Sequence, residues 1–133
     1  MKWFASIVLA IVFCGCSATL TRLPRPLKLS DESLEPLETI EVSNANFLLL
    51  SCLPIASGDP QSPNGGGCRW FKDTVTVTNQ LLMLENEAAR IGATRAIGIT
   101  TLKTHESWCF FLLEREKLRT SAILVRDKKE GLK

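Results

Sequence analysis

Apolar and polar positions alternate along the chain in a way that predicts several β-strands. Residues 46–53 form a nearly unbroken apolar run, which is typical of a short strand buried on both faces. Within residues 69–78, Val75 and Val77 alternate with threonines, so this segment is either a strand or an extended lead into a helix. Three more strands are predicted towards the C-terminal end of the chain, at residues 96–102, 108–113 and 121–126.

One helix is predicted between these strands. Leucine, alanine and isoleucine recur at helical spacing over residues 81–91, with polar side chains between them for solvent. Thr78 or Asn79 can cap the start of this helix, because the side-chain oxygen can accept a hydrogen bond from an amide of the first turn. Gly92 follows the last periodic residue and can adopt the left-handed conformation that ends a helix.

The order of these elements predicts an α+β domain, with one helix packed on a four- to five-stranded, largely antiparallel sheet. A single helix covers only one face of such a sheet, so part of the second face should meet water, a loop or a partner. Residues 57–67 are rich in glycine, proline and serine and are predicted to form a flexible loop. The Lys-Ser/Thr pair of a phosphate-binding loop does not follow them.

The first residues of the chain have the pattern of an export signal. Lys2 precedes an apolar run over residues 3–13, which is too short to span a bilayer because that needs about 20 residues. Gly15-Cys16-Ser17 comes next, and this ending resembles the lipobox of bacterial lipoproteins. The resemblance implies cleavage after Gly15, acylation of Cys16 and, through Ser17, transport to an outer membrane. An uncleaved N-terminal anchor and an ordinary secretory signal are the alternatives.

The resemblance to a lipobox predicts that the chain has four parts. Residues 1–15 would be the lipoprotein signal peptide, and residues 16–39 the acylated N-terminus with a flexible, proline-containing tether. Residues 40–127 would form the folded domain, and residues 128–133 a basic tail. A flexible coil of the tether's length would hold the domain about 25 Å from the bilayer.

Charge and composition exclude some classes of function. The chain has 16 Lys and Arg and 14 Asp and Glu, and removal of Lys2 with the signal leaves 15 basic side chains. Such a neutral balance does not suit a nucleic-acid-binding protein, which usually carries a basic face. His105 is the only histidine, and the spacing places no nucleophile or acid beside it. The sequence therefore identifies no cofactor and no small-molecule substrate, and we expect no enzymatic activity.

Three cysteines remain once Cys16 is acylated and the signal is removed, namely Cys52, Cys68 and Cys109. In an exported protein, paired cysteines usually form disulfides, so we expect one disulfide and one spare thiol. A zinc site made of these cysteines and His105 is an alternative, although the close Cys-x2-Cys pairs of structural zinc sites are missing.

Four features form a further pattern: an early cysteine, a glycine-rich loop, a helix with two adjacent alanines, and a Gly-Ala pair directly before a strand. They are held by Cys52, residues 65–67, Ala88-Ala89 and Gly92-Ala93. The pattern resembles the RcsF-like group of small bacterial lipoproteins, which includes the Rcs envelope-stress sensor. The resemblance covers roughly residues 40–126 and implies a disulfide between Cys52 and Cys109. Cys68 has no counterpart in that group, and a Cys52–Cys68 disulfide is the alternative.

These observations predict a membrane-anchored bacterial lipoprotein whose small α+β domain binds an envelope partner, with stress sensing as a candidate role. One alternative is a structural or surface lipoprotein without a signalling role. A second, less favoured alternative is a metal-binding or enzymatic lipoprotein. We expect the protein to be anchored in the cell envelope, at the outer membrane, with its domain facing either the periplasm or the cell surface. A binding module should expose an apolar patch at the bare sheet face or near the glycine-rich loop, where an exposed Trp70 could anchor a partner.

Overall fold

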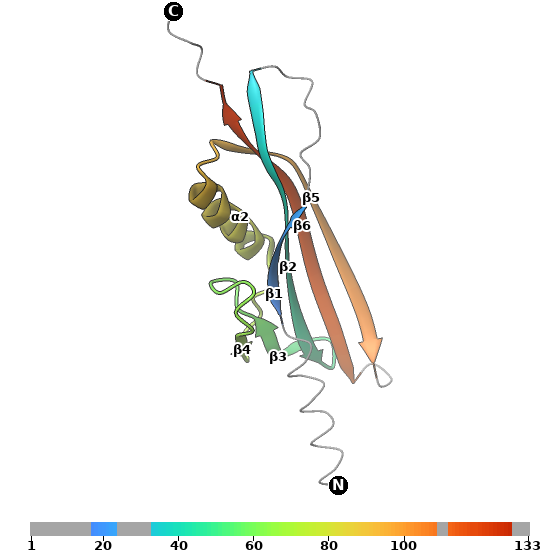
Figure 1. Cartoon of the computed structure of the whole chain (residues 1–133). Helices are drawn as coiled ribbons and strands as arrows, with labels where there is room; N and C mark the ends of the chain where they lie inside the picture. Colours follow the sequence, from blue (N-terminus) through green and yellow to red (C-terminus); the bar gives the residue numbers. More distant parts are fainter. Residues whose placement is uncertain (1–16, 24–32, 109–111, 129–133) are drawn as a thin grey trace, which may run out of the picture.

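The computed structural model describes residues 17–23, 33–108 and 112–128, and it shows one helix on a largely antiparallel sheet (Figure 1). The α+β prediction is therefore confirmed. The described part of the chain contains one helix, α2 (Val77–Ile91), and six strands. The strands are β1 (Ala18–Leu23), β2 (Leu34–Leu49), β3 (Leu53–Gly58), β4 (Cys68–Trp70), β5 (Arg95–Trp108) and β6 (Leu113–Asp127).

The sheet is built around two long strands, β2 and β6, of 16 and 15 residues. They pair from Leu34–Asp127 at one end to Leu49–Leu113 at the other. The strand order is β4-β3-β2-β6-β5, and β1 pairs with β2 outside this path. β1 and β3 both pair with the edge of β2 that faces away from β6. β1 pairs with residues 39–44 of β2, and β3 pairs with residues 46–49.

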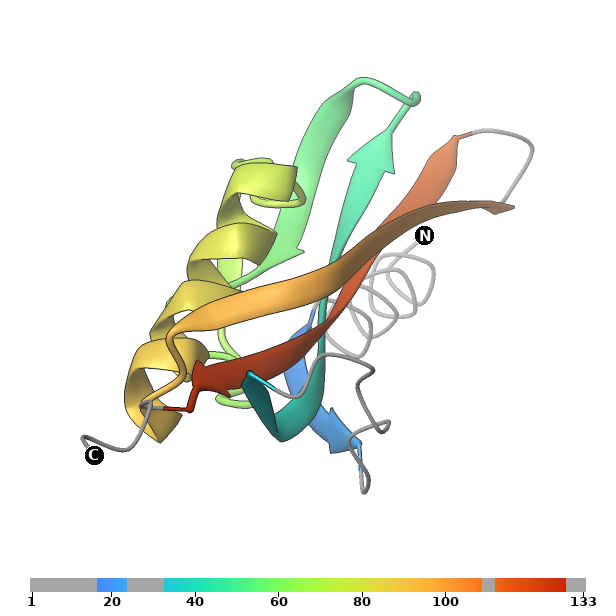
Figure 2. The same cartoon turned by 90° about the horizontal axis from the view of Figure 1, so that it is seen from above.

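The helix covers one face of the curved sheet, as Figure 2 shows from above. Its buried residues Met83 and Leu84 pack in one core cluster with Ile40 of β2 and Leu124 of β6. Apolar side chains at alternate positions of the strands are buried here, as the period of two requires. Phe47 and Ala56 form a second, smaller cluster towards the other end of β2.

The helix begins at a different residue from the ones that the sequence favours. Thr76 is the N-cap, and its Oγ1 accepts a hydrogen bond from the amide of Asn79 at 3.2 Å. The prediction of Thr78 or Asn79 is therefore wrong by two to three residues. Gly92 ends the helix with a φ of 72°, which confirms its predicted role.

The segment before the helix is an extended lead rather than a strand over most of its length. Only Cys68–Trp70 is β-strand, and residues 72–75 have no regular secondary structure. Side chains of the buried residues Asn44 and Asn46 hold this lead against β2. Asn44 Nδ2 donates to the carbonyl of Thr74 at 2.9 Å, and Asn46 Nδ2 donates to Asp73 Oδ1 at 3.0 Å.

The apolar run of residues 46–53 is not one strand, as predicted, but a hairpin. It contains the end of β2, a tight turn and the first residue of β3. Leu50 and Ser51 have φ values of 52° and 62°, the left-handed region that tight hairpin turns use. Asn-Gly usually provides these angles, and without that pair the sequence gives no sign of the turn.

The three predicted C-terminal strands are two longer ones, β5 and β6. The charged residues that suggested connecting loops alternate within these strands and form ion pairs across them. Lys103 Nζ lies 2.9 Å from Glu116 Oε1, and Arg119 Nε lies 3.3 Å from Glu41 Oε1. Such cross-strand pairs allow an exposed sheet surface to carry many charges.

The predicted tether is wrong for the parts of residues 16–39 that the structure describes. Residues 18–23 form β1, and β2 begins at Leu34 rather than near residue 40. The carbonyl of Ser17 accepts a hydrogen bond from the amide of Ala45 at 3.1 Å, so the sheet begins directly after Cys16. Pro36 is tolerated in β2 because it lies at a break in the β2–β6 register. Residues 24–32 lie outside the described residues.

Candidate binding groove

Several of the predicted site residues lie outside the described part of the chain. These are the signal segment of residues 1–15, the acylation site Cys16, the disulfide partner Cys109 and, except for Lys128, the basic tail of residues 128–133. Their roles stay predictions. No helix among the described residues is long and apolar enough to cross a membrane.

Cys52 and Cys68 lie at opposite ends of β3. Cys52 is exposed in the β2–β3 turn and bonds to no described cysteine, whereas Cys68 pairs in register with Gly58 at the far end of the strand. The five residue steps of β3 span about 16 Å. A disulfide joins α-carbons that are at most about 7 Å apart, so the alternative Cys52–Cys68 pairing is wrong for this structure.

His105 lies on β5, half exposed, beside the carboxylate of Glu116 on β6. Its Nδ1 is 3.5 Å from Glu116 Oε1, and the same oxygen is 2.9 Å from Lys103 Nζ. Within residues 17–23, 33–108 and 112–128, no three His, Cys, Asp or Glu side chains are close enough to hold a metal ion. The structure thus separates Cys52 and Cys68 instead of gathering them into the alternative zinc site, and His105 is part of a surface charge cluster.

The sheet face opposite the helix is polar at its centre. Thr19 and Ser43 share a hydrogen bond between their hydroxyl oxygens at 2.8 Å, and Arg119 pairs with Glu41 beside them. The expected apolar patch is therefore not at the centre of this face. Near the glycine-rich loop, Trp70 is exposed as the sequence allowed, and Phe71 beside it is 78% exposed.

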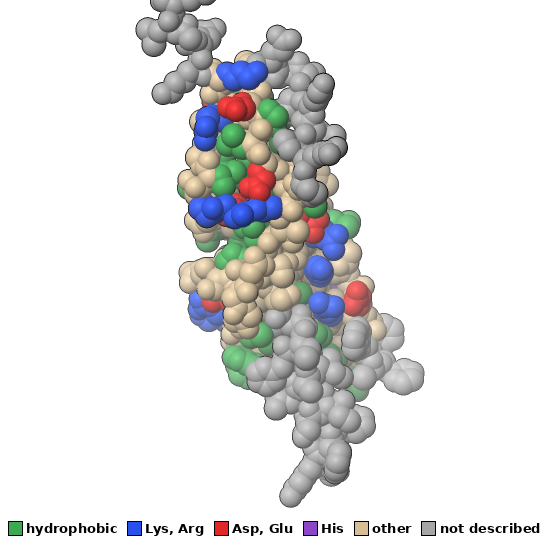
Figure 3. Space-filling model, in the orientation of Figure 1, with side chains coloured by type: hydrophobic (Ala, Val, Ile, Leu, Met, Phe, Trp, Pro, Cys, Tyr) green, Lys and Arg blue, Asp and Glu red, His purple; other side chains and the backbone are tan. Residues whose placement is uncertain are grey.

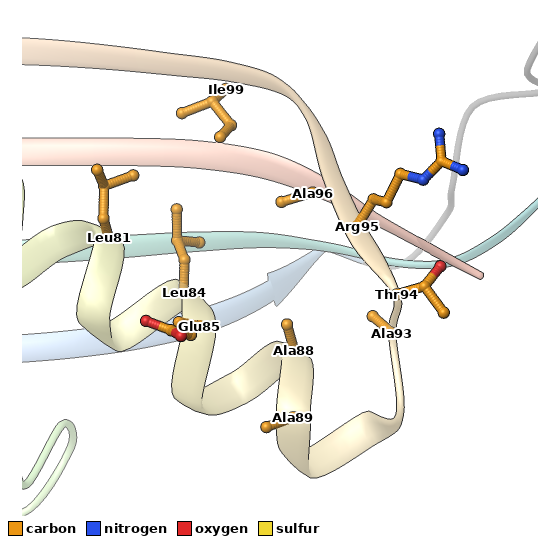
Figure 4. Close-up of a pocket in the computed structure, with 10 residues that line it drawn as sticks. All are labelled: Leu81, Leu84, Glu85, Ala88, Ala89, Ala93, Thr94, Arg95, Ala96 and Ile99. Carbon is orange, nitrogen blue, oxygen red and sulfur yellow. The ribbon is translucent and has the colours of Figure 1, made fainter. Parts of the chain in front are cut away.

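An apolar hollow lies between α2 and the edge strand β5, and we call it the helix–edge groove. It has a volume of about 410 Å³. Figure 4 shows Leu81 and Leu84 of the helix pointing towards β5, and Ile99 of β5 pointing towards the helix. Leu81 and Ile99 are 42% and 48% exposed, which leaves apolar surface open to a ligand.

Small side chains make the space for this groove. Ala88 on the helix, Ala93 after it and Ala96 on the strand line it with only a methyl group each. β5 has a bulge just after Ala96. The β5–β6 register shifts between Ile97 and Thr100, and Gly98 has a φ of 61°. The bulge places Ile99 on the groove side. Larger side chains at the alanines would close the hollow.

The strand edge beside the groove is unpaired in the described part of the chain. β5 is the last strand of the sheet and bonds only to β6. The N–H and C=O groups on its outer edge can therefore pair with an added strand. Arg95 at one end of the groove is held by Asp127, with Nη2 and Oδ1 2.7 Å apart.

A charge cluster around the buried Glu87 joins the helix to β1. Glu87 accepts hydrogen bonds from Arg90 at 2.7 and 2.8 Å and from Arg22 of β1 at 3.1 and 3.2 Å. The hydrogen bond from Arg90 is the main cause that lowers the pKa of the Glu87 carboxyl below its ordinary value. Burial opposes this change, and Arg22 adds to it. The carboxylate is charged at neutral pH and joins the helix to β1.

The sequence did not point to this groove. The helix and the next strand were both predicted, but the bulge at Gly98 and the position of β5 at the sheet edge depend on pairing between distant residues. The small residues Ala88, Ala93 and Ala96 are the local signal of a space between the two elements.

No protein-family model matches the chain, and no curated protein or solved structure is significantly similar to it. The fold and the groove geometry are therefore the basis for the functional proposal.

Proposed function

We propose that this protein is a membrane-anchored lipoprotein of the bacterial envelope, and that its domain binds a partner protein in the helix–edge groove. The observation that carries the proposal is the coincidence of an apolar groove with an unpaired strand edge. The proposed role is non-enzymatic, with envelope-stress sensing as its candidate biological context. The lipid anchor rests on the sequence around Cys16, which resembles a lipobox.

An extended segment of the partner is the ligand that suits this geometry. Its backbone would pair with the outer edge of β5, and alternate side chains would point towards the helix. One or two apolar side chains of the segment would then lie between Leu81 and Ile99. Backbone pairing would supply general affinity, and the groove would select apolar residues at one position of the segment.

The neighbouring turns support the disulfide that the family resemblance implies. The amide of Leu50, in the β2–β3 turn with Cys52, donates to the carbonyl of Leu112 at 3.1 Å. Leu112 belongs to the connection between β5 and β6, which also contains Cys109. A Cys52–Cys109 bond would join these two connections at the same end of the sheet.

Site-specific photocrosslinking in the native membrane tests the proposal. A benzoylphenylalanine at residue 81 is expected to form an adduct with an envelope protein. The matched control replaces Leu102, which is also exposed on β5 but pairs with Arg119 and therefore lies on the polar face opposite the helix. Ile99→Asp should abolish the residue-81 adduct, whereas Leu102→Asp should not.

The outcomes separate the alternatives. A protein adduct that maps to an extended segment of the partner and depends on Ile99 supports the proposal. Equal labelling from residues 81 and 102, or adducts with lipid alone, would contradict partner binding in this groove. Mass spectrometry of the mature protein tests the anchor independently, because cleavage before Cys16 and added acyl chains change the mass, and an uncleaved Met1 terminus would contradict it.

A further inference from the structure

Exposed leucines gather at the end of the sheet where the β2–β3 and β5–β6 connections meet. We call this set the leucine tip. Its members and their exposed fractions are Leu49 (40%), Leu50 (54%), Leu53 (56%) and Leu112 (55%). The hydrogen bond from the amide of Leu50 to the carbonyl of Leu112 holds the two connections together. The leucines therefore form one surface rather than isolated exposed side chains.

Two aromatic residues extend this apolar surface along β3. Phe71 is held beside it by a 3.0 Å hydrogen bond from its amide to the carbonyl of Ile55, and Trp70 precedes it at the end of β4. Figure 3 shows apolar side chains at the lower end of the molecule, where β3 and β4 lie in Figure 1. Trp and Leu side chains are suited to the boundary between lipid headgroups and acyl chains.

The backbone at this end adopts left-handed angles that bulky residues rarely use. Four non-glycine residues of the described chain have a positive φ, and three of them are Leu50, Ser51 and Phe71. Bulky residues avoid this conformation, so a purely structural turn would be expected to use glycine or asparagine. Such strain is commonly found at functional surfaces.

The start of the mature chain lies close to the same end. Ser17 is fixed to Ala45 by a hydrogen bond, and Ala45 is four residues from Leu49 on β2, which corresponds to about 13 Å along the strand. The α-carbon of Cys16 is one residue further, within about 3.8 Å of that of Ser17. No flexible tether separates the acylation site from the sheet, so an acylated Cys16 would hold the leucine tip close to the bilayer.

We propose that the leucine tip inserts into the interface of the bilayer that carries the Cys16 acyl chains. This inference rests on the proposed lipid anchor. Ser17 lies only about 13 Å along β2 from Leu49, so acyl chains on the neighbouring Cys16 would keep the leucine tip within reach of the bilayer interface. The carboxylate of Glu114, close behind the leucines, already accepts a 2.7 Å hydrogen bond from Ser51 Oγ.

This contact would give the domain a fixed orientation. The pair Ile97–Ile123 beside the helix–edge groove is ten residues along β6 from Leu113, which is roughly 30 Å. With the tip in the membrane, the groove would open at the far end of the domain, where a partner protein can reach it. The lipid therefore takes the place of the expected flexible tether as the element that positions the domain.

Depth-dependent fluorescence quenching of the full-length lipoprotein tests the proposal. Dansylalanine is introduced at residue 53 or at residue 102, whose leucines are both 56% exposed in the native chain. Each protein is reconstituted into phosphatidylethanolamine–phosphatidylglycerol vesicles that contain nitroxide-labelled lipids. The residue-53 probe should show a blue-shifted emission and quenching by shallow nitroxides, and the residue-102 probe should show neither.

Two further proteins make the result decisive. Replacing Leu49, Leu50 and Leu112 with serine should reduce quenching at residue 53, with thermal melting confirming that the domain stays folded. Cys16→Ala separates this inference from the proposed anchor, because loss of the acyl chains should weaken membrane retention. If the acylated protein shows no more quenching at residue 53 than at residue 102, tip insertion is wrong while the anchor stands. If the wild type carries no acyl mass that Cys16→Ala lacks, and the two proteins are retained equally, the anchor itself is wrong.

Discussion

Arg22 of β1 and Glu87 of α2 form an ion pair across 65 positions of the sequence, with Nη2 and Oε1 3.1 Å apart. Arg90 of the helix binds the same carboxylate, and the Glu87 side chain is only 8% exposed. The three charges connect the first strand of the domain to its helix. A strand that sequence patterns assign to a tether is thus fixed to the core by a specific contact.

The stability of the domain should depend on pH through Glu87. Its pKa is lowered in the folded state, mainly by the hydrogen bond from Arg90, so its charged form stabilises the fold. This contribution is complete above the unfolded pKa of about 4.3 and is lost as the pH falls through the lower folded value. We expect Glu87→Gln to lower the free energy of unfolding by about 1–3 kcal/mol at pH 7.

Thermal denaturation from pH 7 to pH 3 measures this effect. The difference between the wild type and Glu87→Gln should shrink as the pH falls through the lowered pKa of the folded Glu87 carboxyl, because the native carboxylate then becomes protonated as well. Glu85→Gln, on the exposed side of the same helix, is the control and should change the melting temperature little. Equal effects of the two substitutions would show that the Arg22–Glu87–Arg90 contact does not stabilise the domain.

Gly58 should be essential for the docking of β1. A β-carbon at this position would collide with the backbone nitrogen of Ala18 and the carbonyl carbon of Ser17. Gly58→Ala is therefore expected to destabilise the domain by about 1–3 kcal/mol and to speed hydrogen exchange in residues 18–23. Gly67→Ala is the matched control, since its β-carbon would meet only the Asp59 side chain at an ordinary 3.5 Å. Similar exchange in the two variants would contradict a tightly docked β1.

The sequence predicts those parts of the fold that depend on local pattern. Gly92 ends the helix as expected, and the helical spacing over residues 81–91 places Leu84 in the core. These predictions succeed because a helix and its last residue are determined mostly by neighbours a few positions away. The fold class then follows from the order of the elements.

The missed features depend on partners that are distant in the sequence. The prolines and mixed charges before residue 40 suggest a tether, but β1 is a strand because residues 39–44 and Glu87 pair with it. The turn at Leu50 and Ser51 lacks the Asn-Gly pair typical of tight hairpins, and its shape is fixed by the pairing of β2 with β3. The helix–edge groove requires the Gly98 bulge, which is visible only when β5 is aligned with β6. Tertiary pairing overrides local preference at each of these places.

Cys52 and Cys109 should be joined in protein isolated from the envelope. The hydrogen bond between Leu50 and Leu112 attaches the turn that carries Cys52 to a residue three positions after Cys109 in the sequence. Peptide mapping without reduction should recover a Cys52–Cys109 peptide, and Cys52→Ala should lower the free energy of unfolding by about 2–5 kcal/mol. Cys68→Ser should leave that linked peptide intact. A Cys52–Cys68 peptide would contradict the strand register that separates these two residues.

Substitution of two threonines decides where the helix begins. The Oγ1 of Thr76 accepts the Asn79 amide, so Thr76→Ala leaves that amide without its cap and should cost about 1 kcal/mol. Thr78 lies exposed within the first turn, where alanine has the higher helix propensity, so Thr78→Ala should be neutral or slightly stabilising. Urea denaturation measured by circular dichroism gives both free energies. A larger loss of unfolding free energy from Thr78→Ala than from Thr76→Ala would instead support the helix start that the sequence favours. The first turn of α2 would then begin further from the Asn44–Thr74 hydrogen bond that precedes it in this structure.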